Sequence, residues 1–580
     1  MTEQFDLLIS GGTLVDGTGA PAFTGDLAIR DGVIVAVGSH IEGTARERID
    51  AVGLLVTPGF VDVHTHYDGQ ATWDGLLEPS SNHGVTTLVM GNCGVGFAPV
   101  APGKESWLIE LMEAVEDIPG AALSEGMTWG WETFPQYLDA LDRCEWSVDV
   151  AAQIPHAALR AYVMGQRGAD NEDATDDDIE RMATLVREAI EAGALGFTTS
   201  RTLAHRTKDG EVVPGTYANE RELFALGDAL RDANAGVYEI VPLGAVGEQI
   251  ESAMDEVDWI IRLAERTGRP FTFVSTQVNN APEMWREVFA ACEEARNRGI
   301  RVYPQVSGRP TGVLFGLDSR HPFVGRPSYD EVAHLDTAKR AKVLADRALK
   351  QKILGESSTA ASVSFMPSFF TDLASRLFVL GTPPDYEPGP ERCVAAIAAA
   401  EGVSSESKLY DLLVANDGRD LLLLPAFNYS NGDSEVTREM LMHPASVLGL
   451  SDGGAHCATI CDASQPTWML THWARDRSRG EGMSLEKVVK LQTLDGAELY
   501  GFGDRGVLAV GKRADVNVID HANLTLHPPR VAHDLPAGGR RLKQDASGYV
   551  VTIVNGVITR RDGVDTGARP GRLVRAASAR

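Results

Sequence analysis

Residues 57–67 read TPGFVDVHTHY and combine a short apolar strand pattern with two histidines. His64 and His66 are two positions apart, so in an extended strand both imidazoles project from one face and converge on one point. One metal ion fits such a point, because imidazole is the commonest metal-donating side chain. The alternative is a half-buried strand with two exposed histidines. The Pro-Gly pair before the strand and the Tyr-Asp-Gly turn after it favour the metal site.

The composition is typical of a folded protein that acts on small molecules. The chain has 580 residues, 43% of them apolar and 23% charged, without a low-complexity tract. It carries 53 basic and 81 acidic residues, a formal charge of −28. This charge excludes nucleic acid and anionic membranes as expected partners, because both select basic patches. Length and acidity allow a homo-oligomer.

The cysteine pattern and the N-terminus predict a cytoplasmic location. The six cysteines are scattered and form no C-x-x-C pair, which is typical of a reducing compartment. The first residues, MTEQFDLLISGG, lack a basic region followed by a long apolar run, and no stretch reaches the roughly 20 apolar residues of a membrane helix.

Both ends of the chain predict short strands separated by glycine turns. These patterns lie at 5–56, 506–520 and 549–563, where an Asn-Gly pair signals a hairpin. Their shared character suggests one sheet domain made from both ends of the chain, residues 1–57 and 501–580. Two separate small β units are the alternative.

The middle of the chain, 58–500, alternates strand and helix patterns, which predicts parallel βαβ units and an α/β fold. Eight such strands would close a (β/α)8 TIM-like barrel, with reactive groups at the strand ends. The candidate strands are 60–63, 85–90, 148–152, 195–198, 236–241, 271–274, 301–304 and 447–450. Residues 311–445 are less regular and read as an insertion that either covers the site or serves oligomerisation.

Two further strand ends carry metal-binding side chains. Cys93 lies in a glycine-rich turn directly after strand 85–90, where a thiolate could bind zinc; a buried, inert cysteine is the alternative. Asp452 follows the last strand, with His456 four residues later. An aspartate there can ligate a metal and take a proton from water, or it can simply cap a helix.

Several motifs together resemble the amidohydrolase superfamily and, within it, the D-aminoacylases (N-acyl-D-amino-acid deacylases). The resemblance covers nearly the whole chain and rests on GGTLVDGTG, TPGFVDVHTHYD, GVTTLVMGNCGVGFAP, IPHAALRAYVMG, GALGFTTSR, LSDGGAH and DRGVLAVGKRADVNVID. It implies a (β/α)8 barrel with a β-sandwich built from both termini, one or two divalent ions such as zinc, and small-molecule N-acyl or other amide substrates.

The resemblance assigns roles to four residues. His64 and His66 match the family's H-x-H, Cys93 its metal-binding cysteine and Asp452 its catalytic aspartate. Two further family histidines, on the fifth and sixth strands, are replaced here. The corresponding positions are Val241 and Thr276, and neither side chain replaces an imidazole. We therefore expect a metal site made by His64, His66 and Asp452, with Cys93 or Glu239 as additional donors.

The family's substrate-carboxylate contacts are only partly recognisable. Arg201 and Arg309 are candidates for bidentate anion recognition, with a structural salt bridge as the alternative for each. The remaining candidates for substrate binding are His205, Tyr303 and His456.

Three functions are consistent with the sequence. The first is hydrolysis of N-acyl amino acids, in which a metal polarises the carbonyl and Asp452 serves as general base and then acid. The second is another amidohydrolase reaction on a cyclic amide, lactone or carbamate. The third is a non-catalytic scaffold, which the two replaced histidines would support.

Overall fold

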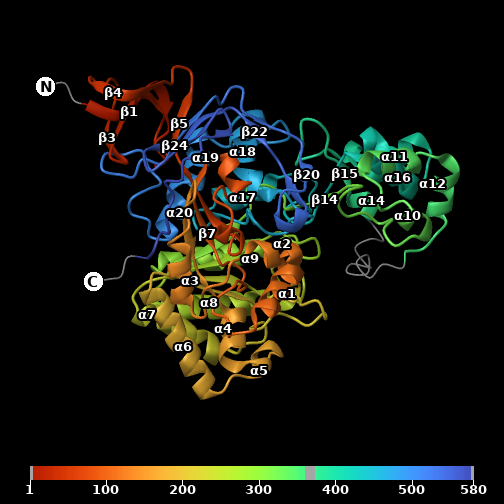
Figure 1. Ribbon diagram of the computed structural model, residues 1–580, viewed down its shortest axis with the longest axis horizontal. Coiled ribbons are helices and arrows are strands. Elements are labelled where there is room, and N and C mark those ends of the chain that lie inside the picture. Colours follow the sequence, from red (N-terminus) through yellow and green to blue (C-terminus); the bar gives the residue numbers. More distant parts are fainter. Residues whose placement is uncertain (1–3, 359–372, 577–580) are drawn as a thin grey trace.

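The computed structural model describes residues 4–358 and 373–576. One nine-stranded sheet contains strands from both ends of the chain (Figure 1). Its centre is the antiparallel pairing of β5 (Leu55–Pro58) with β18 (Val516–Ile519). Leu7, Ile9 and Ile553 belong to the apolar core on one face of this sheet. The other strands are β1 (Gln4–Leu14), β2 (Phe23–Arg30), β3 (Val33–Gly38), β4 (Thr44–Asp50), β23 (Tyr549–Val554), β24 (Val557–Arg561) and β25 (Val564–Asp565).

The central strands are parallel and lie in two sheets. The first has the order β6-β7-β8 and the second the order β17-β13-β12-β11-β10-β9. Every residue of β6 and β7 is buried, as expected for parallel strands covered on both faces. The strands are β6 (Phe60–Thr65), β7 (Val85–Met90), β8 (Asp149–Ala152), β9 (Ile154–Pro155), β10 (Gly196–Ser200), β11 (Val237–Val241), β12 (Phe271–Val274), β13 (Val302–Val306) and β17 (Val447–Leu448).

Backbone hydrogen bonds connect the two parallel sheets. Leu195 N donates to Ala152 O over 2.8 Å, and His66 N donates to Gly453 O over 2.7 Å. A parallel bridge also joins Thr65 to Gly453. The carboxyl end of β6 therefore lies beside the segment that follows β17, which brings the first and last predicted strand ends together.

Amphipathic helices cover these strands. Helix α6 (Asp176–Glu191) begins at Thr175, whose hydroxyl and Asp178 form a capping box, and it buries Ile179, Met182 and Val186 at helical spacing. The helices that follow are α7 (Glu220–Asp232), α8 (Ala253–Thr267) and α9 (Met284–Asn297). Among the described residues, no helix is long and apolar enough to cross a bilayer.

The described residues 312–358 and 373–425 form a separate lobe, at the right of Figure 1. Strands β14 (Gly312–Phe315), β15 (Phe378–Val379) and β16 (Leu422–Pro425) make its sheet, and its core is distinct from the core of the parallel strands. Sequence patterning predicts a single helix over 336–356, which is wrong. The structure has α11 (Thr337–Leu344) and α12 (Arg347–Leu354), because Asp346 caps the second helix by accepting a hydrogen bond from Leu349 N.

Two other element boundaries differ from the predictions. The last parallel strand is only Val447–Leu448, since Leu450 has a positive φ of 58° and turns the chain out of the sheet. Sequence patterning predicts a helix over 248–267, whereas α8 begins only at Ala253, after a short 3-10 turn over Ile250–Ser252.

Candidate metal centre

Strand β6 places His64 and His66 on one side of the sheet. Both side chains are 1% exposed, and their ring centroids lie 5.5 Å apart. Thr65, between them, faces the other way and donates its hydroxyl to Val89 O over 2.8 Å. The alternation predicted from the strand period is therefore present, and the alternative of two exposed histidines is wrong.

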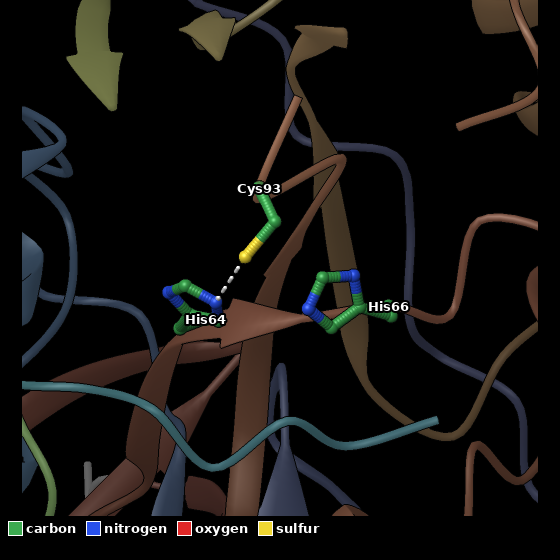
Figure 2. Close-up of side chains that lie close together, drawn as sticks. All are labelled: His64, His66 and Cys93. Carbon is green, nitrogen blue, oxygen red and sulfur yellow. Dashed lines mark hydrogen bonds between the residues drawn. The ribbon is translucent and has the colours of Figure 1, made fainter. Parts of the chain in front are cut away.

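Cys93 approaches the histidines from the turn that follows β7. Its sulfur lies 3.3 Å from His64 Nε2 (Figure 2). The turn is tight: Cys93 itself has a φ of 56°, and a Cβ on Gly94 would come within 2.8 Å of Ser200 N. The Asn92 side chain fixes the turn by donating to Thr65 O and Val89 O. A non-glycine residue held at positive φ is typical of functional sites.

One ligand atom from each of His64, His66 and Cys93 lies within 4.8 Å of the others, close enough for all three to hold one ion. His64 Nδ1 lies 2.8 Å from Gln305 Oε1, to which it donates. This hydrogen bond places the proton on Nδ1, so the lone pair of Nε2 points at Cys93, where it accepts the thiol hydrogen or can bind a metal. Such an outer hydrogen bond is usual for a metal-binding histidine. Two imidazoles and a thiol are a donor set that suits zinc.

Asp452 joins this cluster from the segment after β17. Its Oδ1 is 3.4 Å from His64 Nε2 and 3.9 Å from His66 Nε2. Its backbone has a φ of 47°, and its side chain is 19% exposed. Asp452 is therefore the member of the cluster that solvent reaches most easily.

Glu116 belongs to the same cluster, although no sequence pattern predicts it. It is the last residue of α1 (Glu105–Glu116), is 1% exposed, and lies with Oε1 3.5 Å from His66 Nδ1. Its Oε2 is 3.6 Å from His456 Nε2. Neither Glu116 Oε1 nor His66 Nδ1 has a hydrogen-bond partner among the described residues. In the sequence, Glu116 is an ordinary acidic residue of an amphipathic helix.

Glu239 lies on the far side of Cys93. Its Oε2 accepts a hydrogen bond from Cys93 N over 3.0 Å, while its buried Oε1 has no partner among the described residues. The two positions that replace family histidines contribute no donor here. Val241 is part of the apolar core, and the Thr276 hydroxyl donates to Ala245 O.

The centre concentrates buried acidic groups. Burial raises the pKa of Asp62 and Asp68 to about 7 and that of Glu239 to about 8. Burial also raises the pKa of Asp452 to about 6, and burial with neighbouring carboxylates raises the pKa of Glu116 well above its ordinary value. Across the described ranges these carboxylates form no ion pair with lysine or arginine. A bound cation would offset this accumulation of negative charge.

The structure places the other candidate residues in different settings. Arg201 Nε donates to both carboxylate oxygens of Glu256, and Arg309 is fully buried against Asp462. Both arginines thus have the structural salt bridge considered as the alternative. Tyr303 packs under the guanidinium of Arg296, outside the cluster.

The two remaining histidine candidates lie near the centre. His456 contacts Glu116, as described above, and has a φ of 47°. His205 Nδ1 lies 2.9 Å from Ser200 Oγ. Burial, followed by the charges of His456 and His64, lowers the pKa of His205 to about 3.

Two adjoining hollows open beside the cluster. The first encloses about 330 Å³, including its opening to solvent, and is lined by Asp452, Gln70 and Arg541 among others. The second encloses about 260 Å³ on the same basis and is lined by His66 and by apolar side chains such as Trp73. The described part of the 311–445 insertion lines neither hollow, so no described residue of it covers the site there.

Comparisons with known proteins agree with this geometry. A family model described as the amidohydrolase family matches residues 47–560. An uncharacterised protein of Mycobacterium tuberculosis is 28% identical over 99% of this chain and 96% of its own length. A D-aminoacylase of Alcaligenes xylosoxydans xylosoxydans is 30% identical over 63% of this chain and 75% of its own. These matches confirm the resemblance predicted from the motifs.

A solved structure shares the fold. It is N-acyl-D-glutamate deacylase from Bordetella bronchiseptica, complexed with zinc and a phosphonate inhibitor that mimics the tetrahedral intermediate of its reaction. It is 24% identical, covers 99% of this chain and 100% of its own, and gives a TM-score of 0.65.

Proposed function

Because the chain belongs to the amidohydrolase family, we propose that it hydrolyses the amide bond of N-acyl amino acids. The family consists of metal-dependent hydrolases of carbon–nitrogen bonds other than peptide bonds, so the predictions of an enzyme and of a divalent metal cofactor are confirmed at that level. The observation that supports the proposal most strongly is the convergence of His64, His66 and Cys93 beside Asp452.

Zinc is the proposed metal, in one or two ions. His64, His66 and Cys93 would hold it, with Asp452 and Glu239 as further donors. When bound, zinc supplies Lewis-acid chemistry, which polarises a carbonyl group and lowers the pKa of water. The buried carboxylates around these donors support a cation there, because burial alone disfavours their charged forms.

Asp452 is the proposed general base and acid. Its carboxylate is more exposed than the histidines and lines the larger hollow, so it can reach both a water molecule and a substrate amide. It takes the proton from the attacking water and then delivers it to the leaving nitrogen. The amide bond breaks to give a carboxylate and a free amine.

A second candidate is hydrolysis of a cyclic amide, lactone or carbamate. It is favoured by one observation: Val241 and Thr276 stand where D-aminoacylases carry two histidines, so the ligand set differs from that of those relatives. A non-catalytic scaffold is disfavoured, because the donor cluster and Asp452 are assembled together at the strand ends.

The test is turnover of a panel of N-acyl-D-amino and N-acyl-L-amino acids by the zinc-loaded protein and by Asp452→Asn. We expect hydrolysis of at least one enantiomeric series and a loss of at least about 100-fold in the variant. Near-normal turnover by Asp452→Asn with zinc bound would exclude Asp452 as the base. Turnover of cyclic amides or lactones alone would favour the second candidate.

Several broader predictions belong with this proposal. We propose that the parallel strands form a closed (β/α)8 barrel and that the sheet from both termini belongs to a β-sandwich. The proposed boundaries are 1–57 with 501–580 for the sandwich and 58–500 for the barrel. The cytoplasmic location, the homo-oligomer and the lack of nucleic-acid and membrane partners also remain predictions.

A further inference from the structure

A hairpin from the C-terminal part of the chain reaches the metal centre. It consists of β20 (Arg530–Ala532) and β21 (Arg541–Lys543), which pair antiparallel. Leu542 N donates to Cys457 O over 2.6 Å, which fixes the hairpin to the segment that follows Asp452. Arg541 and Leu542 line the larger hollow, and Leu535, between the two strands, lines the smaller one. The hairpin therefore forms part of the wall of the site.

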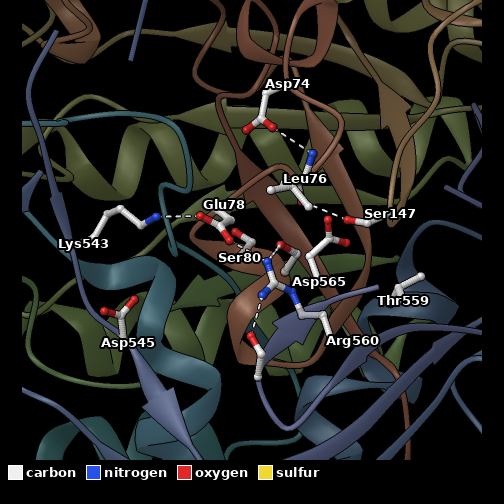
Figure 3. A network of polar contacts seen from close by, with 12 residues as sticks. Asp74, Leu76, Glu78, Ser80, Ser147, Lys543, Asp545, Thr559, Arg560 and Asp565 are labelled. Carbon is white, nitrogen blue, oxygen red and sulfur yellow. Dashed lines mark hydrogen bonds and ion pairs between the residues drawn. The ribbon is translucent and has the colours of Figure 1, made fainter. Parts of the chain in front are cut away.

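Arg541 is the one lysine or arginine among the described residues that line either hollow. Its side chain is 8% exposed. Nε and Nη2 donate to the two oxygens of Asp534, and Nη1 donates to Glu78 O. A guanidinium has five N–H groups, so two remain without a hydrogen bond among the described residues. Asp74, which acts on Arg541 electrostatically, is bonded instead to Gln70 and to the backbone N–H of Leu76 (Figure 3).

The hairpin is held rigidly enough to fix the position of this guanidinium. Lys543 pairs with both Glu78 and Asp534, and Arg560 pairs with Glu78 from strand β24. Figure 3 shows Glu78 between Lys543 and Arg560. Because Asp534 and Glu78 hold the rest of the guanidinium, the free N–H groups are preorganised for one more acceptor.

The smaller hollow has the opposite character. Beside His66 its wall is made by Trp73, Ile118, Leu123 and Leu535, all apolar. Gln70, Gly454 and Cys457 line both hollows, so the two adjoin. Asp452 and Arg541 thus line the larger hollow, while His66 lines the smaller, mainly apolar one.

We propose that Arg541 binds the carboxylate of the substrate, while the smaller hollow takes an apolar acyl or side-chain group. The assignment rests on the proposed function and deepens it by naming the residue that selects an anionic substrate with an apolar group. The two candidate arginines from the sequence, Arg201 and Arg309, pair with Glu256 and Asp462, and neither lines a hollow. Arg541 lines the hollow that contains Asp452.

The test compares N-octanoylglycine with its neutral carboxamide. The two compounds differ only in the terminal group, a carboxylate in one and an uncharged amide in the other, and neither has a chiral centre. The readout is the ratio of kcat/KM for the acid to kcat/KM for the carboxamide, with the zinc-loaded full chain. We expect the wild type to prefer the acid. Arg541→Gln should reduce this ratio at least tenfold, mainly through KM, because a charge-assisted bidentate contact is lost.

Lys543→Gln is the matched control. Lys543 is equally buried and shares Glu78 and Asp534 with Arg541, but it lines neither hollow. Its ratio should stay within threefold of wild type. An equal loss of preference in both variants would assign the effect to the hairpin fold and overturn the proposal, as would retention of the preference by Arg541→Gln.

Binding separates this inference from the proposed function. In the Asp452→Asn background, the dissociation constants of the two N-octanoyl compounds are measured by calorimetry with and without Arg541→Gln. A preference for the acid that disappears with Arg541 supports the anion site even if the wild type hydrolyses neither compound, a result that would reject the proposed function alone. Equal affinities for acid and carboxamide when Arg541 is present would reject the anion site.

Discussion

Replacing Glu116 by glutamine tests whether this buried carboxylate supports the metal centre. The substitution keeps the size of the side chain and removes its charge beside His66 Nδ1. Once His66 donates Nε2 to a metal, its Nδ1 carries the proton and needs an acceptor. Glu116 Oε1, 3.5 Å away and without another partner, is the acceptor available among the described residues.

The expected magnitude follows from this distance. Two full unit charges 3.5 Å apart attract by about 5 kcal/mol at an effective dielectric constant near 20. The imidazole receives only part of the charge of a bound ion, so the support is smaller. We expect Glu116→Gln to lose about 1.4–2.8 kcal/mol of zinc-binding free energy, which corresponds to a 10–100-fold higher zinc dissociation constant.

The assay is zinc competition against a chromophoric chelator, with circular dichroism to confirm folding. Glu113→Gln is the control, since Glu113 lies one turn earlier on α1 and pairs with Lys208 on the surface. A zinc affinity of Glu116→Gln within threefold of wild type would refute the reasoning. Loss of a whole equivalent of zinc would instead identify Glu116 as a direct ligand.

Three further predictions concern zinc binding, stability in acid and the buried ion pairs of Asp149. The double variant His64→Ala, His66→Ala should lose bound zinc by elemental analysis, and unchanged zinc content would remove both residues from the site. Burial raises the pKa of Glu387, but contacts with His472 and Arg477 outweigh it and lower the pKa to about 2. Its stabilisation, about 3 kcal/mol, is therefore present above pH 4.5 and lost as the pH falls towards 2. The unfolding free energy of Glu387→Gln, measured with denaturant, should fall less over this pH range than that of the wild type; an equal fall would contradict this. Asp149→Ala should cost about 3–5 kcal/mol of unfolding free energy, because it leaves Arg505 and Arg513 buried without their shared carboxylate; a loss below about 1 kcal/mol would contradict it.

Local periodicity explains which parts of the site were predictable. His64 and His66 share a face because a strand repeats every two residues, and Cys93 and Asp452 follow strands that end at the same edge. Glu116 was not predictable in this way. It comes from a helix in the connection after β7, and only the tertiary position of that helix aims its carboxylate at His66.

The ion-pair partners of the arginines could not be predicted from local sequence either. A sequence shows that an arginine is present but not which acid has already engaged it. Arg201 and Arg309 follow strand ends, as substrate-binding residues do, yet Glu256 and Asp462 hold them. Arg541 lies in a segment that reads only as the gap between two predicted strand regions, because its position depends on pairing with Glu78, far earlier in the chain. The split of the predicted 336–356 helix has a local cause, the Asp346 cap, that helical spacing alone does not reveal.

The pairing of β5 with β18 sets the order in which the molecule can be completed during synthesis. The Lys543–Glu78 ion pair spans 465 positions. The N-terminal strands and the wall of the site can therefore form their contacts only after β18 and the hairpin have been synthesised. Contacts this distant slow folding and leave strand edges exposed in the meantime. The wall that we propose to bind substrate is therefore complete only after residues 516–561 have left the ribosome. A nascent or C-terminally shortened chain has His64 and His66 without that wall.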